Sequence, residues 1–344
     1  MKIGLYAGMH DDALRFIRQM GLDQVISAPP SSPDGYFDLP TLLRMKTYFE
    51  SFGLRWEVIE NLPTQYYYKA MWGLPGRDEQ IEKCMRSIRN VGAARIPVLQ
   101  YGWMILGGLR TEYSPTGRGG SRYSRFDLSI AEQHPLAAMD WLGTSPDYPR
   151  APDRSLDAEE AWEHYSYFLR CLVPVAEEAG VKLAIHPDDP PIPQYMGVAR
   201  IISSLDALQR VIDTVPSPNN GLGFCQGTIA TMAGVDVVEA IYRFGRQNKI
   251  FFAHLRNPRG QVPRFDEVFP DEGDTDLFAA VRAYRDVGFD GVVRIDHCPS
   301  IVDDNDRAER SFAYQTGYAK GLVHALRAFE TDFPRPQPAL RGGQ

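Results

Sequence analysis

Short runs of apolar and β-branched residues alternate along the chain with longer stretches of helical periodicity. This alternation is typical of repeated βα units, in which helices cover a sheet of parallel strands. The pattern predicts eight strands, at residues 2–6, 24–28, 55–59, 95–101, 181–186, 221–225, 250–255 and 292–296. It predicts helices between and after them, at residues 12–20, 39–52, 77–91, 157–179, 204–214, 235–245, 275–287 and 306–329.

Eight βα units without a Gly-rich phosphate loop favour a closed (β/α)8 TIM barrel over an open doubly wound α/β sheet. Barrels of this kind commonly take about 250 residues or more, so the 344 residues fit one domain. We predict a single barrel domain over residues 1–330. Repeated Gly and Ser-Pro turns at about 102–152 predict a long irregular insertion after the fourth strand, and the Pro- and Gly-rich residues 331–344 predict a disordered tail.

Composition and charge narrow the function. The net charge of −7 argues against a surface for nucleic acid or anionic lipid, which requires clustered Lys and Arg. No apolar run approaches the roughly 20 residues of a membrane helix, and the first residues lack a secretory pattern. The four scattered cysteines indicate reduced thiols. We therefore expect a cytoplasmic enzyme or binding protein whose partner is a small molecule, with no nucleic acid and no membrane.

Four potential metal ligands close the last four predicted strands, namely His186, Cys225, His254 and Asp296. In a TIM barrel the strands end together at one mouth, where the chemistry takes place, so these side chains can converge on one ion. Each residue alone has an ordinary structural explanation, but all four at one level of consecutive strands predict a shared site. Two imidazoles, a thiolate and a carboxylate suit Mn2+, Fe2+, Co2+, Ni2+ or Zn2+ better than Ca2+ or Mg2+.

Further polar residues follow the same strand ends. Asp188 and Asp189 are predicted to orient a ligand imidazole, the alternative being turn-forming residues before the prolines. His297 follows Asp296 and can reach over the mouth. Arg256 and Asn257 follow His254 and are predicted to bind a substrate carboxylate or hydroxyls, although a surface position would also explain Arg256.

Two further residues have a structural interpretation beside a functional one. Glu60 closes the third predicted strand and either faces the mouth or forms a structural ion pair. Tyr318 lies in the last predicted helix, where packing in the core is the simplest explanation.

Several segments together resemble the D-mannonate dehydratases of the hexuronate pathway, which are metal-dependent enzymes on a xylose-isomerase-like TIM barrel. The segments are LAIHPDDPP, GLGFCQGT, AHLRN and the Asp-His pair of RIDHC. Upstream, EVIENLP, GLPGRDEQIEKCMRSIRNVG and the insertion segment LRTEYSPTGRGGSRYSRFD are also similar to that family. The resemblance runs from about residue 54 to about residue 326.

The resemblance implies a function and roles for individual residues. It implies that His186, Cys225, His254 and Asp296 bind Mn2+, and that His297 and Tyr318 act as general acid and base, with neither role assigned to either residue. Arg110, in the insertion segment, joins Arg256 and Asn257 as a predicted substrate contact. The implied reaction converts D-mannonate to 2-keto-3-deoxy-D-gluconate and water in hexuronate catabolism, and the implied assembly is a homodimer with residues 102–152 as a contact surface.

The chain also departs from the family pattern. The family commonly has Phe-His-Glu with a second His close behind, where this chain has RFDEVF, with Asp266 at the first His and Phe269 near the second. At the first strand end GLYAGMH stands in place of an Arg-Trp pair, and Ile295 to Cys298 stand in place of Pro-Asp-His-Gly. These departures indicate a divergent member of the family. D-mannonate remains the expected substrate, and another sugar acid or another reaction is the alternative.

Two alternative functions remain open. One is a sugar or sugar-acid isomerase or epimerase on the same metal-binding barrel, which usually employs strand-end Glu residues and finds support in Glu60. The other is a non-catalytic homologue that binds a sugar acid, supported by the missing Phe-His-Glu pattern.

Overall fold

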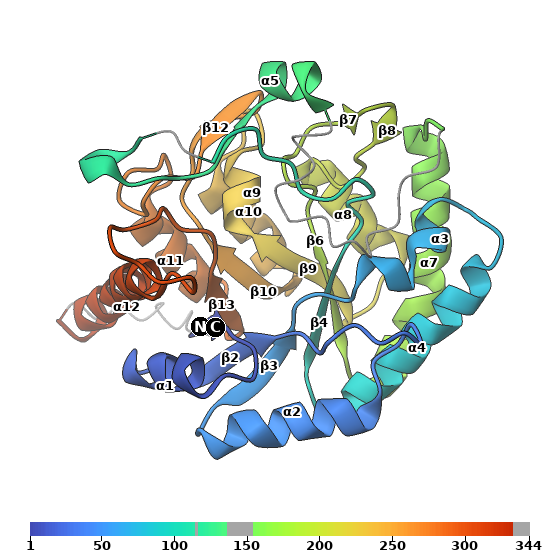
Figure 1. The fold of residues 1–344 in the computed structure, drawn as a ribbon, viewed down its shortest axis with the longest axis horizontal. Coiled ribbons are helices and arrows are strands. Elements are labelled where there is room, and N and C mark those ends of the chain that lie inside the picture. The colour runs from blue at the N-terminus through green and yellow to red at the C-terminus, as the bar shows by residue number, and fades with distance from the viewer. Residues whose placement is uncertain (114–115, 136–153, 333–344) are drawn as a thin grey trace, which may run out of the picture.

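The chain folds into a closed barrel of eight parallel strands, as the sequence predicts (Figure 1). The computed structural model describes residues 1–113, 116–135 and 154–332. Around the barrel the strands follow the order β1-β13-β10-β9-β6-β4-β3-β2, and every neighbouring pair is parallel. Their bounds are β1 (Lys2–Tyr6), β2 (Gln24–Ser27), β3 (Arg55–Ile59), β4 (Val98–Gly102), β6 (Lys182–His186), β9 (Asn220–Cys225), β10 (Ile250–Leu255) and β13 (Val292–Ile295).

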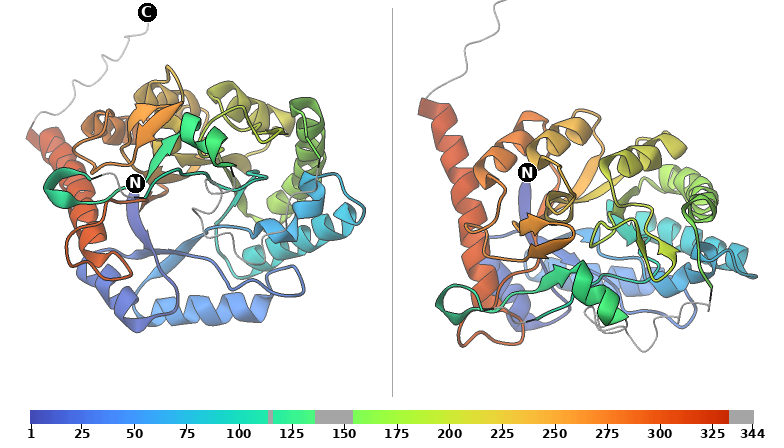
Figure 2. Two further views of the ribbon diagram at one scale, coloured as in Figure 1. Left: turned by 45° about the horizontal axis from the view of Figure 1, so that its top comes forward. Right: turned by 90° about the horizontal axis from the view of Figure 1, so that it is seen from above.

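Within the described residues, eight longer helices cover the outside of the barrel (Figures 1 and 2). They are α1 (Asp11–Gln19), α2 (Leu39–Ser51), α4 (Arg77–Ala93), α7 (Ala158–Ala179), α8 (Leu205–Thr214), α10 (Val237–Gly245), α11 (Leu277–Asp286) and α12 (Glu309–Asp332). Side-chain oxygens of Asp38, Asp157, Ser204, Asp236 and Asp276 cap α2, α7, α8, α10 and α11, because each accepts a backbone N–H of the first turn. None of the helices in the described part of the chain is both long and apolar enough to cross a membrane.

Apolar side chains fill the inside of the barrel below the mouth. One buried cluster consists of Ile26, Val58, Val98, Ala184, Phe251, Phe252 and Val292. A much larger cluster packs the strands against the surrounding helices. The polar groups at the mouth therefore lie directly above closely packed apolar side chains. The ring of Phe252 packs edge-on against His254, with 4.9 Å between the ring centroids.

Five of the eight predicted strands differ at an end from the structure, four of them by a single residue and β4 by more. β4 begins at Val98 and not at residue 95, because Arg95 adopts a positive φ of 56° in the turn after α4. A strand requires a negative φ, so the prediction was wrong at this end. β13 ends at Ile295, which places Asp296 on the first position beyond the strand.

A small sheet stands over the mouth of the barrel, on the side of α5 (Leu128–Gln133) (Figure 2). It joins β5 (Arg125–Asp127) from the segment after β4 to the hairpin β11 (Arg259–Gln261) and β12 (Arg264–Asp266) after β10. The predicted insertion at 102–152 therefore contains ordered structure in its first part, while residues 136–153 lie outside the described residues. The predicted tail begins inside α12, and residues 333–344 also lie outside them.

The remaining elements are short and connect the barrel units. They are the 3-10 turns η1 (Thr64–Tyr66) and η2 (Arg118–Gly120), the helices α3 (Tyr68–Met71) and α9 (Gln226–Ala230), and the pair β7 (Gln194–Tyr195) and β8 (Val198–Ala199).

Candidate metal centre and active site

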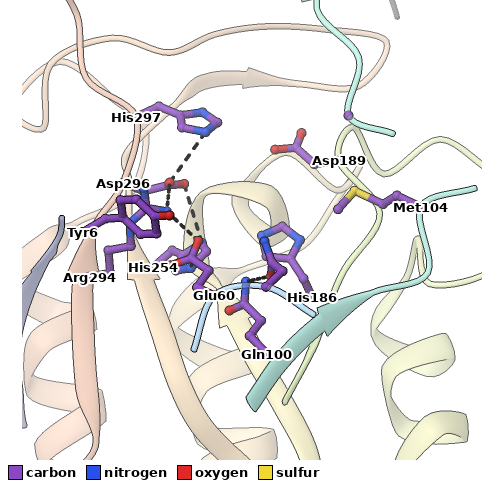
Figure 3. A pocket seen from close by; sticks show the side chains of 12 residues that line it. Tyr6, Glu60, Gln100, Met104, His186, Asp189, His254, Arg294, Asp296 and His297 are labelled. Atoms are coloured by element: carbon purple, nitrogen blue, oxygen red, sulfur yellow. Dashed lines mark hydrogen bonds and ion pairs between the residues drawn. The ribbon is translucent and has the colours of Figure 1, made fainter. Parts of the chain in front are cut away.

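The four strand-end residues meet at the mouth of the barrel. Figure 3 shows three of them, His186, His254 and Asp296. One ligand atom from each of His186, Cys225 and His254 lies within 4.8 Å of the others, and all three residues are buried. Asp296 completes the cluster, because its Oδ2 lies 4.0 Å from Cys225 Sγ and 3.7 Å from His254 Nδ1. The structure thus brings together every residue of the predicted ligand set.

His186 presents one defined ring nitrogen to the cluster. Its Nδ1 lies 2.6 Å from the carbonyl oxygen of Pro187. A carbonyl oxygen only accepts, so Nδ1 donates here and Nε2 keeps its lone pair for the cluster. The prediction that the following aspartates orient a ligand imidazole is wrong for His186. Asp188 instead accepts the backbone N–H of Ile202 at 2.7 Å.

The Cys225 sulfur is surrounded by hydrogen-bond donors. The backbone N–H and the hydroxyl of Thr228 point at Sγ from 3.4 and 3.1 Å, and the Arg256 Nη2 group lies 3.8 Å away. A sulfur that accepts hydrogen bonds on one side can bind a metal on another, and the thiolate is the form of cysteine that binds metal. The surroundings of Cys225 therefore suit a metal ligand.

The carboxylate of Asp296 is held in its ionised form. Burial by itself would raise the pKa of this carboxyl, but His297, His254 and Arg294 hold the pKa well below its usual range. Arg294 donates from Nη1 to Asp296 Oδ1 at 3.0 Å and to Glu60 Oε1 at 2.7 Å. One oxygen of Asp296 is thus engaged by arginine, while the other faces the sulfur and the imidazole.

His297 follows Asp296, and contacts with Glu267 and Arg256 on the side away from the cavity orient its ring. Its Nδ1 lies 2.9 and 3.1 Å from the two oxygens of Glu267 and 2.7 Å from Arg256 Nη1. Its Nε2 points the other way and lies 3.6 Å from Asp296 Oδ1. The nitrogen that remains beside the cavity is therefore Nε2.

A buried ion-pair network supports this histidine. Arg110 forms two parallel hydrogen bonds of 2.9 Å with the carboxylate of Asp189, and Arg256 Nη2 donates to the same carboxylate at 3.0 Å. Both arginines also contact Glu267. Burial alone would raise the pKa of each carboxyl, but the two guanidinium groups hold the pKa values of Asp189 and Glu267 well below their usual range. Two positive and two negative charges thus balance one another inside the protein.

A cavity of about 300 Å³ opens above the metal cluster. This volume is at the lower end of the range for small-molecule sites, roughly 300–1,000 Å³. Figure 3 shows its polar lining, to which β1, β3, β4, β6, β10 and β13 or their following loops contribute. The lining residues are Tyr6, Glu60, Asn61, Gln100, Met104, Gly108, His186, Asp189, His254, Arg294, Asp296 and His297.

The three predicted substrate contacts lie outside this lining. Arg110 and Arg256 are 2% exposed and belong to the ion-pair network. Asn257 holds a loop together, because its amide nitrogen donates to the carbonyls of Pro270 and Thr275 and its oxygen accepts the N–H of Thr275. The structure places these three side chains in supporting positions and does not bring them to the cavity.

The structure also shows where Tyr318 and Glu60 lie relative to the cavity. Tyr318, on α12, is partly buried against the hydrophobic core and is not among the cavity residues, so the structure does not bring it together with His297. Glu60 directly follows β3 and lines the cavity, and it pairs with Arg294 there. Both interpretations of Glu60, a group at the mouth and an ion-pair partner, therefore hold.

Sequence reasoning missed several residues of the site. Arg294 lies two positions before Asp296 and so points to the same face of the strand, which is a signal that the period of two offers. Tyr6 ends the first strand, where the strand-end rule would also have found it. Glu267 has no strand-end signal of the barrel, since it reaches His297 from the position directly after β12, in the small sheet over the mouth.

The residues of this cluster fit a divalent transition metal. Both ring nitrogens of His254 are buried and have no hydrogen-bond partner that meets normal geometry among the described residues. Buried polar atoms without partners are rare, and a metal ion would satisfy one of them. Nitrogen, sulfur and carboxylate donors together suit a metal of intermediate softness.

Comparison with known protein families points in the same direction. The model of the family described as D-mannonate dehydratase (UxuA) matches residues 1–331. A mannonate dehydratase of Thermotoga petrophila is 32% identical over 316 residues, which cover 85% of this chain and 87% of that protein.

Solved structures agree with this assignment. The crystal structure of mannonate dehydratase from Streptococcus suis superimposes with a TM-score of 0.84 at 29% identity, covering 100% of this chain and 99% of that one. D-psicose 3-epimerase from Clostridium cellulolyticum shares the fold alone, with a TM-score of 0.63 at 11% identity over 94% of this chain and 99% of that one. Because the family model spans nearly the whole chain and the metal cluster lies at its strand ends, the chain belongs to the D-mannonate dehydratase family.

Proposed function

We propose that this protein is a metal-dependent sugar-acid dehydratase that converts D-mannonate to 2-keto-3-deoxy-D-gluconate and water. The observation that carries the proposal is the convergence of His186, Cys225, His254 and Asp296 at the mouth of the barrel, next to His297 and the cavity that it lines. Membership of the D-mannonate dehydratase family supports the same reaction. We propose Mn2+ as the metal because the family resemblance implies it, and the nitrogen and sulfur donors of the site disfavour Mg2+.

The reaction makes two chemical demands. The proton at C2 is weakly acidic, so negative charge that develops on the neighbouring carboxylate must be stabilised, and the C3 hydroxyl leaves only with help. The bound metal supplies Lewis-acid stabilisation of substrate oxygens. We propose that Arg294 attracts the substrate carboxylate, because it lines the cavity and its Nε is buried without a hydrogen-bond partner in the described parts of the chain.

Proton transfer falls to His297 in this proposal. Glu267 accepts the proton of its Nδ1 and is itself paired with Arg256, which leaves Nε2 on the side of the cavity to take up or deliver a proton. A positioned side chain must lie at the reacting group and be held there to act as acid or base. The roles of Arg110 and Asp189 are then indirect, because they hold Glu267 and Arg256 in place.

The first experiment is turnover of D-mannonate by protein that is stripped of metal and then reloaded. We expect no 2-keto-3-deoxy acid from the stripped protein and restored product after addition of Mn2+. Addition of Mg2+ should fail to restore it, because Mg2+ prefers oxygen ligands in octahedral geometry. If the protein bound one metal ion per chain but formed no product, D-mannonate would be rejected as the substrate and the metal site would stand. If product formed in the presence of a chelator, the reaction would not need the metal.

A second test concerns Tyr318. Because its ring packs against the core and does not line the cavity, we expect Tyr318→Phe to keep kcat and KM close to those of the unmodified enzyme. Loss of the hydroxyl changes neither the metal cluster nor His297. A large fall in kcat with a normal thermal unfolding curve would instead return Tyr318 to the reaction, as the family resemblance implies.

An epimerase or isomerase is the second candidate, and one observation favours it. The carboxylate of Glu60 lines the same cavity as His297, so two groups that can exchange protons face one bound molecule. Product analysis separates the candidates. A dehydratase releases a keto acid that is one water lighter than its substrate, whereas an epimerase or isomerase leaves the mass unchanged.

The remaining features of the proposal follow from the chemistry and the family. All four cysteines are free thiols, which agrees with a cytoplasmic enzyme of hexuronate breakdown. We also propose a homodimer, in which residues 102–152 contribute contact surface. The mass of the protein in solution, measured by light scattering, tests the dimer.

A further inference from the structure

His254 lies between two carboxylates, one at each ring nitrogen. Its Nδ1 is 3.7 Å from Asp296 Oδ2, and its Nε2 is 3.4 Å from Glu60 Oε1. His254 is 3% exposed and Glu60 is 9% exposed, so both groups are largely shielded from solvent. In Figure 3, Glu60 lies next to the ring of His254, beneath Asp296. The two nitrogens therefore have different surroundings, and only one of them can bind the metal.

The distances indicate which nitrogen that is. At metal–nitrogen and metal–oxygen distances of about 2.1 Å and a metal–sulfur distance of about 2.3 Å, tetrahedral ligand atoms lie roughly 3.4–3.6 Å apart. Asp296 Oδ2 is 3.7 Å from His254 Nδ1 and 4.0 Å from Cys225 Sγ, which is within a few tenths of an ångström of that arrangement. Nε2 lies on the far side of the ring, beside Glu60.

We propose that His254 binds the metal through Nδ1, and that Glu60 is the positioning residue that accepts the proton of Nε2–H. His186 binds through the opposite nitrogen, Nε2, because its Nδ1 donates to the Pro187 carbonyl. The 3.4 Å between His254 Nε2 and Glu60 is longer than an ordinary hydrogen bond, and metal binding at Nδ1 shortens it by fixing the tautomer. The inference rests on the metal site of the proposed function and not on its substrate.

Arg294 connects this contact to a second ligand. One nitrogen, Nη1, donates to Glu60 Oε1 at 2.7 Å and to Asp296 Oδ1 at 3.0 Å. The guanidinium group therefore orients both the acceptor for His254 and the carboxylate that binds beside it. Arg294 and His254 converge on Glu60 Oε1 and Arg294 neutralises its charge, so this oxygen acts behind the ligand His254.

Variants at Glu60 test the role through metal affinity. Glu60→Leu removes the acceptor, and we expect it to weaken Co2+ binding by about 10–100-fold, as is typical of partners that orient a ligand histidine. Glu60→Gln keeps a side-chain oxygen that can accept Nε2–H, so its affinity should fall by less. Glu57→Gln is the matched control, because Glu57 lies on the same strand but pairs with Lys2 away from the cluster, and should bind as the unmodified protein does.

Proton NMR of the unmodified protein loaded with Co2+ tests the coordinating nitrogen without any variant. In a ring bound through Nδ1, the carbon-bound proton Hδ2 is one bond farther from the metal than in a ring bound through Nε2, so its shifted signal is sharper. We expect one such sharp signal, from His254, and exchangeable N–H signals from both histidines. The His254 N–H should exchange faster with solvent in Glu60→Leu.

Three outcomes would overturn the inference. They are unchanged affinity in Glu60→Leu, a spectrum in which both histidines are bound through Nε2, and absence of Co2+ binding by the unmodified protein. Mannonate turnover, measured on the same preparations, separates this inference from the proposed function. Turnover with a spectrum of two Nε2-bound rings would reject the inference alone, whereas the expected spectrum without any turnover would reject the dehydratase and leave the inference standing.

Discussion

Replacement of His297 by asparagine should abolish turnover and leave the metal bound. The asparagine amide can keep a contact with Glu267, where Nδ1 now lies, but it has no group at the position of Nε2. Loss of a positioned proton-transfer group lowers kcat by about 10²–10⁴-fold. The four metal ligands remain in place, so the metal content should stay at one ion per chain. The measurement is kcat with D-mannonate, together with metal analysis of the dialysed protein.

The matched control is His324→Asn on α12, where the histidine is exposed and belongs to neither the cavity nor the cluster. It should behave as the unmodified enzyme does. A His297→Asn enzyme with an undiminished kcat would exclude His297 from proton transfer. A variant that also loses its metal would show that His297 supports the cluster through Asp296, to which its Nε2 lies close.

Replacement of Cys225 by serine should remove the metal and the activity together. Four-ligand zinc sites bind with about 10–16 kcal/mol, so one ligand accounts for roughly 2.5–4 kcal/mol. At 1.4 kcal/mol for each tenfold change, metal affinity should fall on the order of 10²–10³-fold. The serine hydroxyl stays protonated at neutral pH and does not replace the thiolate, although Thr228 would still donate to it. Competition with a chelator of known affinity measures the change.

Cys171→Ser provides the control, because this thiol lies on α7 and is only partly buried. It should bind metal as tightly as the unmodified protein. If Cys225→Ser bound metal with undiminished affinity, the sulfur would not be a ligand and the site would consist of two histidines and a carboxylate. Excess Mn2+ should restore part of the activity of Cys225→Ser, whereas it should not help His297→Asn.

The departures from the family pattern divide into two groups once they are placed in the fold. Asp266 forms ion pairs with Arg125 and accepts from Tyr123, so it fastens β12 to β5 above the mouth. Phe269 packs against Tyr314 and under the guanidinium of Arg118. Neither residue lines the cavity. These two departures therefore change the sheet over the mouth and leave the lining of the cavity intact.

Tyr6 is the departure that does reach the cavity. It ends β1, at the strand end where the family tends to carry an Arg-Trp pair, and it lies against Arg294 at 5.5 Å from the guanidinium carbon to the ring centroid. A change of substrate within the family would act through the lining, so Tyr6 is the first position to examine if D-mannonate gives no product.

The sequence by itself determined the barrel and the four residues that meet at its mouth. Alternation of strand and helix periodicities is a local property, and it predicts eight parallel strands without any knowledge of their neighbours. Because parallel strands end together at one mouth, the last residue of each strand is brought to one place by the fold, and this rule selected His186, Cys225, His254 and Asp296.

Only the tertiary structure decided what surrounds those residues. Arg110 and Arg256 look like substrate contacts in the sequence, but Asp189 and Glu267 pair with them in the interior. These partners lie 79, 157, 67 and 11 residues away along the chain, and no local pattern encodes them. The choice of ring nitrogen in His254 has the same origin. A strand-end position brings an imidazole to the mouth, but the direction in which its two nitrogens face depends on Glu60 and Asp296, which come from other strands of the barrel.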